Sequence, residues 1–376
     1  MKKIVIFGAG RIGRRAIKKY GKEKIAFIID NDNSLYDSNI EGIEIKSPDC
    51  LRQDTEVYRI VIASRQARSM IHQLSLMGID NYEIFDTKFN TGELIINPYD
   101  GRLTDDWNGQ GIQQKILDIN EEVAQLCKSK LPIFSHIEIE TINRCNGECS
   151  FCPVNKKRDP RPYGKMEIEL FHKIILELKK LEFDGSIVLF SNNEPFLDSR
   201  ITEFIMYARE HLNKAFLHIS TNGTLLTVEK LIQVIPYLDE IVIDNYNQQL
   251  ELNPTSIAIV NYCENHQEVK DKVKIILRRP KDVLTSRGGD APNSEREEKY
   301  PNASCLLPFK QIVIRPDGKV SLCCNDALGK CTLGDVSKQT LEEIWYGNAF
   351  RGVRSQLKSG RSNVERCRYC DTVYIC

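Results

Sequence analysis

The chain contains two blocks in which apolar runs alternate with segments of helical spacing. In the first block, short apolar runs predict buried strands, and apolar residues every three or four positions predict helices. The predicted strands are residues 3–7, 25–30, 58–63 and 82–85, and the predicted helices are residues 11–20 and 66–77. Strands that alternate with helices form parallel sheets, so residues 1–88 are predicted to be a small α/β module.

The second block follows a segment without periodicity. Residues 89–108 are rich in Gly, Asn, Asp and Pro and predict a linker, whereas residues 111–128 have helical spacing. Strands are then predicted at residues 137–141, 187–190, 216–220, 240–244, 256–260 and 273–277. Six β/α units predict a partial (β/α)6 TIM barrel, in which chemistry gathers at the carboxyl ends of the strands. We therefore expect four parts: residues 1–88, 89–130, 131–285 and a cysteine-rich 286–376.

Charge and composition exclude some partners. Lys+Arg and Asp+Glu are both 52, so neither nucleic acid nor an anionic membrane surface is expected to bind. No segment has the roughly 18–20 apolar residues of a membrane span, and the basic, apolar start is interpreted as a strand rather than a signal peptide. Thirteen cysteines in such a chain indicate metal binding in a reducing cytoplasm. Cys50, Cys127 and Cys263 stand alone and are expected to be ordinary buried residues.

The most informative motif is a trio of cysteines, Cys145, Cys149 and Cys152, directly after the first predicted barrel strand. Three thiolates on one short loop can ligate three irons of a cubane cluster and leave the fourth iron open. A structural zinc site is the alternative, but it normally uses paired CxxC elements and four protein ligands.

With this motif, residues 133–376 resemble the radical S-adenosylmethionine superfamily, whose hallmark is CxxxCxxC after the first barrel strand. The resemblance implies that S-adenosylmethionine binds the open iron of a [4Fe–4S] cluster and yields a 5′-deoxyadenosyl radical after one-electron reduction. It also implies contacts to the cofactor from Phe151 (adenine), from the turn Ser191, Asn192, Asn193 and Glu194 (methionine ammonium), from Ser220 and Asn222 (ribose), and from Arg278 or Arg279 (methionine carboxylate). The family usually has a GGE-type turn, so the asparagines leave the backbone contacts of residues 191–194 open.

The tail resembles the SPASM or shorter twitch extension, which holds auxiliary iron–sulfur clusters. Residues 333–354 resemble its LGN…EIW helix, and the resemblance implies Cys305, Cys323, Cys367 and Cys370 as ligands of one auxiliary [4Fe–4S] cluster. Cys376 either replaces one of these ligands or is free. Cys324 and Cys331 either pack around the cluster or donate a hydrogen atom to a substrate radical.

A glycine motif opens the first helix of the chain. Gly8, Gly10 and Gly13 lie between a strand and a helix, and Asp30 ends the next strand, which is the context of a dinucleotide fingerprint. The module resembles short Rossmann-like domains ahead of sugar-modifying enzymes. A nucleotide or nucleotide-linked ligand, a redox dinucleotide and a docking role all remain open.

The hypothesis that unites these features is radical chemistry at a carbon–hydrogen bond. A single auxiliary cluster resembles that of enzymes which oxidise or dehydrate sugar and aminocyclitol hydroxyls, so a carbohydrate or nucleotide-linked sugar is the expected substrate. Flavodoxin or ferredoxin is the expected electron donor. A peptide-modifying SPASM enzyme, a nicotinamide oxidoreductase and a non-enzymatic metal scaffold are the alternatives. The loop of residues 286–289 is expected to be a surface segment or to reach the substrate.

Overall fold

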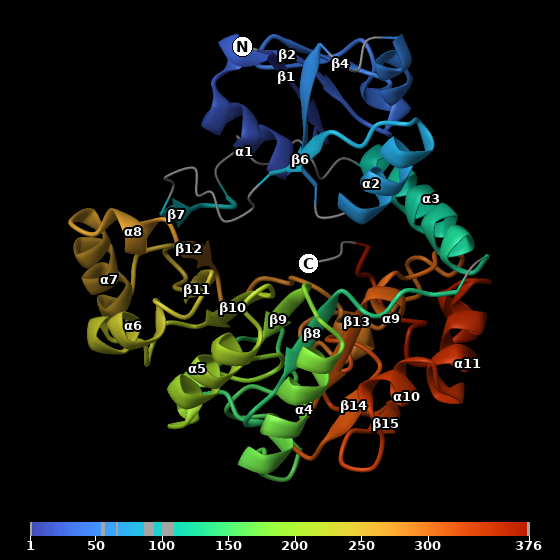
Figure 1. Ribbon diagram of the computed structural model, residues 1–376. Helices are drawn as coiled ribbons and strands as arrows, with labels where there is room; N and C mark the ends of the chain where they lie inside the picture. Colours follow the sequence, from blue (N-terminus) through green and yellow to red (C-terminus); the bar gives the residue numbers. More distant parts are fainter. Residues whose placement is uncertain are drawn as a thin grey trace. The chain divides into compact units, whose positions relative to one another are not determined.

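The computed structural model describes residues 2–53, 57–64, 67–85, 94–99, 109–128 and 130–373 (Figure 1). The chain divides into two compact units, Met1–Glu93 and Leu94–Cys376. Of the predicted site residues, Cys376 lies outside the described residues.

The first unit is a six-stranded sheet in the order β3-β4-β2-β1-β5-β6. Its pairs are parallel except for β3 with β4. Its elements are β1 (Lys3–Phe7), α1 (Arg11–Tyr20), β2 (Ile25–Ile29), β3 (Asn39–Ile40), β4 (Ile43–Lys46), β5 (Tyr58–Ile62), α2 (Ala67–Leu76) and β6 (Tyr82–Ile84). Along β1, Ile4 and Ile6 join the core beneath α1, whereas Val5 and Phe7 join the core beneath α2. This alternation of side chains confirms the predicted parallel sheet with helices on both faces.

The second unit is built on a nine-stranded sheet in the order β15-β14-β13-β8-β9-β10-β11-β12-β7. All neighbours from β13 to β7 are parallel, and β13, β14 and β15 form an antiparallel meander. The strands are β7 (Ile95–Ile96), β8 (His136–Ile139), β9 (Ser186–Val188), β10 (Phe216–Thr221), β11 (Glu240–Tyr246), β12 (Val273–Arg278), β13 (Gln311–Ile314), β14 (Lys319–Ser321) and β15 (Thr332–Asp335). The helices are α3 (Gly109–Leu126), α4 (Ile168–Lys180), α5 (Ile201–His211), α6 (Val228–Val234), α7 (Pro254–Glu264), α8 (Gln267–Lys270), α9 (Leu307–Lys310), α10 (Leu341–Trp345) and α11 (Asn348–Leu357).

Two predictions about the barrel were wrong. Residues 256–260, predicted as a strand, lie inside α7, because Pro254 at its first turn starts a helix whose buried residues Ser256, Ile259 and Cys263 recur at helical spacing. The second concerns the segment of residues 89–108, which was predicted to be a linker only. It contains the strand β7, which pairs in parallel with β12. The partial barrel therefore consists of β8 to β12, with β13 and β7 beside its two outer strands.

The predicted EIW segment forms α10 and ties the tail to the start of the barrel. Trp345 is fully buried, and its indole Nε1 donates a hydrogen bond to the carbonyl of Pro132 at 2.9 Å. Its ring meets Phe134 edge-on, with centroids 5.4 Å apart. No helix in the described part of the chain is long and apolar enough to cross a membrane.

Candidate functional site

The loop after β8 carries the cysteine trio, and all three residues are half-buried. The backbone N–H of Gly147 donates to Cys145 Sγ at 3.3 Å. A Cβ at Gly147 would lie 3.3 Å from Cys145 Sγ and 3.9 Å from Cys149 Sγ, so the two sulfurs border one space that glycine leaves free. Burial, with a smaller contribution from the charge of nearby Cys152, raises the pKa of Cys145 to about 11 and the pKa of Cys149 to about 12.

These thiols fit an iron–sulfur cluster. Their thiolate forms are soft ligands, and binding to iron would offset both their burial and their mutual repulsion. Each cysteine thiolate that ligates such a cluster binds a different iron. Within the described residues, no three His, Cys, Asp or Glu side chains are arranged around a single metal ion.

Glu194 is the last residue of the predicted cofactor turn. The side chain is 1% exposed and accepts hydrogen bonds from Thr221 Oγ1 at 2.7 Å, from the Asn222 N–H at 2.8 Å and from the Phe196 N–H at 3.1 Å. Burial raises its pKa, and these donors oppose that shift. The carboxylate is thus held by neutral donors, as suits a group that receives a positive amino group.

The other residues of this turn reach toward the tail. Asn193 Oδ1 accepts from the Ser191 N–H at 3.0 Å, and the buried Asn193 Nδ2 has no partner within the described residues. Asn192 Nδ2 donates to Ser191 Oγ at 3.0 Å and to the carbonyl of Cys324 at 3.1 Å. The turn and the cysteine-rich tail are therefore in direct contact.

The ribose candidates lie at the end of β10. Asn222 Nδ2 donates to Asn146 Oδ1, on the cysteine loop, at 2.8 Å. Ser220 is half-buried near the end of the same strand. The end of β10 is thereby joined to the loop that carries the cysteine trio.

Aromatic and basic residues line the same end of the barrel. Phe151 is buried, and its ring centroid lies 6.1 Å from that of Tyr246, the last residue of β11. Arg278 Nε donates to Asp244 Oδ1 at 2.6 Å, and Arg279 lies over the ring of Tyr99 at 4.5 Å. The charge of Arg278 is therefore already balanced by a carboxylate.

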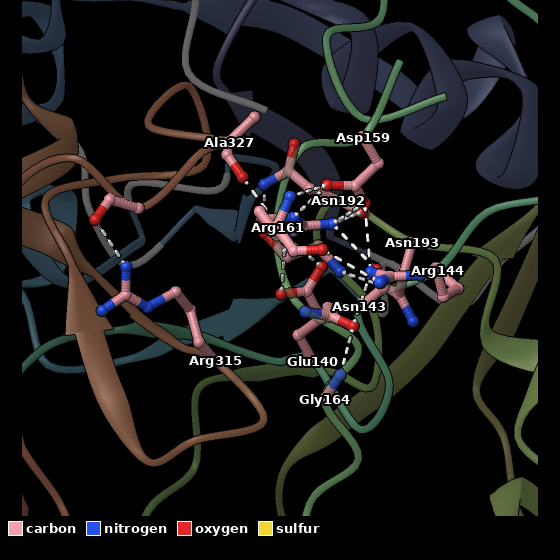
Figure 2. Close-up of polar contacts among 12 residues, drawn as sticks. Glu140, Asn143, Arg144, Asp159, Arg161, Gly164, Asn192, Asn193, Arg315 and Ala327 are labelled. Atoms are coloured by element: carbon pink, nitrogen blue, oxygen red, sulfur yellow. Dashed lines mark hydrogen bonds and ion pairs between the residues drawn. The ribbon is translucent and has the colours of Figure 1, made fainter. Parts of the chain in front are cut away.

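Sequence reasoning missed Arg161, the centre of the polar network in Figure 2. Its side chain, 8% exposed, contacts both oxygens of Glu140 at 3.3 Å and donates to Asp159 Oδ2 at 2.9 Å. It also donates to the carbonyls of Asn192 and Ala327, each at 3.2 Å. One guanidinium thus joins the end of β8, the cofactor turn and the tail.

The loop of residues 286–289 is packed into the molecule rather than lying on its surface. Ser286 is 3% exposed and donates through Oγ to the carbonyl of Tyr369 at 2.8 Å. Arg287 has a left-handed backbone (φ 49°), and its Nη1 donates to Asn192 Oδ1 at 3.2 Å. Its guanidinium lies 6.0 Å from the ring centroid of Phe151. Arg287, in the loop that was expected to lie on the surface or to reach the substrate, therefore contacts both the cofactor turn and Phe151.

The four predicted auxiliary ligands, Cys305, Cys323, Cys367 and Cys370, line one cavity, and all four are buried. Burial raises the pKa of Cys305, Cys323 and Cys367, and charges on neighbouring cysteines raise each further. A closed set of four close thiols fits a fully ligated cluster.

The remaining cysteines differ in their surroundings. Cys324 contacts the cofactor turn through its carbonyl, and the Cys331 N–H donates to Asp326 Oδ2 at 2.9 Å. Cys263 is buried as expected, whereas Cys50 and Cys127 are exposed. The prediction that these last two are buried was wrong, because Cys50 lies in the short 3-10 helix Pro48–Gln53 and Cys127 in the turn directly after α3, both on the protein surface.

The glycine motif of the first unit has the predicted local form. Gly8 (φ 119°) and Gly13 allow close packing, since a Cβ on Gly13 would lie 1.8 Å from the Gly8 carbonyl oxygen, whereas a Cβ on Gly10 would meet open space. Asp30 Oδ2 accepts from the Ala9 N–H at 2.5 Å. The carboxylate therefore closes the loop, and no contact in the described residues identifies a ligand.

Comparisons with known proteins match both halves of the second unit. Residues 139–247 match the Radical SAM superfamily, and residues 305–371 match SPASM, an iron–sulfur cluster-binding domain. The chain is 30% identical over 249 residues to the S-adenosyl-L-methionine-dependent 2-deoxy-scyllo-inosamine dehydrogenase of Niallia circulans, covering 65% of this chain and 95% of that protein.

Two further matches agree with these. A tungsten-containing aldehyde ferredoxin oxidoreductase cofactor-modifying protein of Pyrococcus furiosus is 31% identical over 154 residues, covering 40% of this chain and 41% of that protein. The crystal structure of BtrN in complex with AdoMet and 2-DOIA aligns with a TM-score of 0.56 and 26% identity, covering 64% of this chain and 94% of that chain.

Proposed function

The chain belongs to the radical S-adenosylmethionine enzymes, as its cysteine motif predicted, and we propose that it oxidises a secondary hydroxyl of an aminocyclitol or related carbohydrate to a ketone. The observation that carries this proposal is the 30% identity over 95% of the length of a dehydrogenase that acts on 2-deoxy-scyllo-inosamine. The enzyme uses S-adenosylmethionine, a radical SAM [4Fe–4S] cluster and an auxiliary [4Fe–4S] cluster. When bound, these groups supply a radical that removes a hydrogen atom and a centre that accepts the remaining electron.

We assign the residues of this chain to these groups as follows. Cys145, Cys149 and Cys152 hold the radical SAM cluster, and Glu194 receives the methionine ammonium. The contacts of Phe151 with adenine, of Ser220 and Asn222 with ribose, and of Arg278 or Arg279 with the carboxylate remain proposals. Cys305, Cys323, Cys367 and Cys370 hold the auxiliary cluster, within a tail of residues 286–376.

We also propose that Arg287 binds the reacting hydroxyl. Its guanidinium lies near the ring of Phe151 and donates one hydrogen bond to the cofactor turn, at Asn192 Oδ1. A guanidinium has five N–H donors, so donors remain for a substrate oxygen. A fixed positive charge there favours loss of the hydroxyl proton, which must leave when the ketone forms.

Oxidation needs no hydrogen atom returned to the substrate. Under this proposal, Cys324 and Cys331 are packing residues, and their role as hydrogen donors belongs to epimerisation. Flavodoxin or ferredoxin is proposed as the electron donor that starts the cycle.

The test uses the full chain, reconstituted anaerobically with iron and sulfide. We expect about eight irons per chain from two four-iron clusters. With reductant, S-adenosylmethionine and 2-deoxy-scyllo-inosamine deuterated at its carbinol carbons, we expect deuterium in 5′-deoxyadenosine and one ketone per cofactor cleaved. Cleavage of the cofactor without transfer of deuterium from any of a panel of cyclitols and sugars would contradict the proposal. A modified peptide as product would favour the maturase alternative.

A further inference from the structure

A buried arginine lies beside the auxiliary cysteines. Arg361 is 1% exposed and lines the same cavity as Cys305, Cys323, Cys367 and Cys370. It follows Gly360, whose φ of 112° and whose approach to Pro301 (a Cβ would lie 2.6 Å from the carbonyl oxygen) require glycine. The backbone therefore fixes where this side chain enters the cavity wall.

In the part of the chain that the structure describes, each hydrogen bond of this guanidinium goes to a backbone carbonyl. Nε donates to Ser304 at 3.1 Å, Nη1 donates to Cys370 at 3.0 Å, and Nη2 donates to Thr372 at 2.5 Å. Carbonyl groups satisfy the N–H donors but carry no net charge. Among the ion pairs of the described residues, Arg361 takes part in none.

A second arginine on the same cavity is neutralised. Arg366 pairs with Asp290 and, at 3.1 Å, with Asp326, while Lys330 also pairs with Asp290 at 2.8 Å. The charges of these two cations and two carboxylates cancel. Among the described residues, Arg361 therefore supplies a positive charge at this cavity that no carboxylate balances.

This charge lies next to the proposed ligands. Arg361 lines the same cavity as the four cysteines, and its Nη1 donates to the carbonyl of Cys370, one of them.

We propose that Arg361 tunes the auxiliary cluster as an electron acceptor by placing an uncompensated charge against its ligands. A reduced cluster carries one more negative charge than an oxidised one, and cluster potentials depend on such local charge. In a buried site, a nearby positive charge is weakly screened and stabilises the more negative state. This inference rests on the proposed function: the substrate radical loses one electron to the cluster and its hydroxyl proton to solvent, which leaves the ketone.

The test is a redox titration of the auxiliary cluster, followed by electron paramagnetic resonance. Cys145, Cys149 and Cys152 are replaced by alanine in every sample, so that the radical SAM cluster is not assembled. We expect Arg361→Met to lower the midpoint potential by about 59 mV or more, equivalent to a tenfold change for one electron. Arg361→Lys, which keeps the charge, is expected to retain most of the parent potential.

The control is Arg368→Met, which removes a positive charge beside Cys367 from a side chain that is 45% exposed and pairs with Glu298 at 3.4 Å. Because solvent and Glu298 both reduce the effect of that charge, its shift is expected to be small. Equal shifts in the Arg361→Met and Arg368→Met proteins, or none in either, would overturn the proposal.

If Arg361→Met fails to hold iron, Arg361→Gln, which can still donate to a carbonyl, replaces it in the titration. Loss of the cluster in both neutral variants but not in Arg361→Lys would support a requirement for charge. Loss in all three variants would show a structural role only and overturn the proposal. The titration contains neither substrate nor S-adenosylmethionine, so its result is independent of whether a ketone is made.

Discussion

At the scale of single residues, Glu194 supports a sharp test of cofactor binding. Glu194→Gln puts an amide where the carboxylate accepts three donors, so at least one donor loses its acceptor. We expect a cost of about 1–3 kcal/mol in stability and at least about tenfold weaker S-adenosylmethionine binding, measured by anaerobic calorimetry. Glu148→Gln, an exposed carboxylate on the cysteine loop, is the control and should leave affinity unchanged. Unaltered affinity in Glu194→Gln would remove this residue from the cofactor site.

Glu140 gives a dependence on pH. Burial raises its pKa from 4.5 to about 7, although Arg161 opposes the shift. Between these values the folded protein holds a proton that the unfolded chain has released, so this group's contribution to stability falls as pH rises. We therefore expect the melting temperature of the parent, relative to that of Glu140→Gln, to decrease from pH 5 to pH 7. A constant difference would mean that Glu140 is ionised throughout this range.

Residues were predictable where their role is local. The cysteine trio and Glu194 belong to short motifs, whose spacing is visible in the chain. Arg161 was not, because its partner Glu140 is 21 residues away. The sequence offered Arg287 only as part of the loop of residues 286–289, because its partner Asn192 is 95 residues away. A long arginine side chain can donate hydrogen bonds to several groups that are distant in the sequence, and a single sequence does not indicate which groups these are.

At the scale of elements, α10 is held by Trp345. Trp345→Ala is expected to destabilise the protein by about 3–5 kcal/mol, because it opens a cavity beside Phe134. Trp345→Phe keeps an aromatic ring and is expected to cost about 1 kcal/mol for the lost hydrogen bond to Pro132. Chemical denaturation measures both values. Leu176→Ala, at a position 47% exposed, is the control, and a Trp345→Ala cost no larger than that of this control would refute the anchoring role.

The elements that were mispredicted share a physical cause. A run of four apolar residues such as 257–260 fits a strand or one face of a helix equally well, and here the preceding Asn253–Pro254 pair favours the helix. β7 has two residues and lies among turn-forming residues, so it has no periodicity to detect. It pairs with β12 because β12 would otherwise be an unpaired edge strand, and the sequence of β7 alone does not indicate this pairing.

At the scale of the whole molecule, the two units have separate cores. The core clusters of the first unit contain residues before 94, and the large cluster of the second unit contains residues from Leu94 onward. We therefore expect residues 94–376 to fold alone, bind the same iron and cleave S-adenosylmethionine at a rate within about threefold of the parent. Iron analysis and 5′-deoxyadenosine formation check this.

A chain of residues 97–376 is the matched comparison, since it lacks β7 and leaves β12 at the edge of the sheet. It should be less stable and more prone to aggregate than residues 94–376. If the chain of residues 94–376 failed to bind iron, the first unit would be required for folding of the second.

The nine-stranded sheet runs without a break from the barrel into the tail, because β13 pairs in parallel with β8. A protease that nicked the chain near residue 285 would therefore leave two fragments that share one hydrogen-bonded ladder. Such fragments should co-elute until a denaturant separates them. The cluster-bearing tail is therefore not an independent domain. Transferring it to another barrel would require a first barrel strand that can pair with β13 as well.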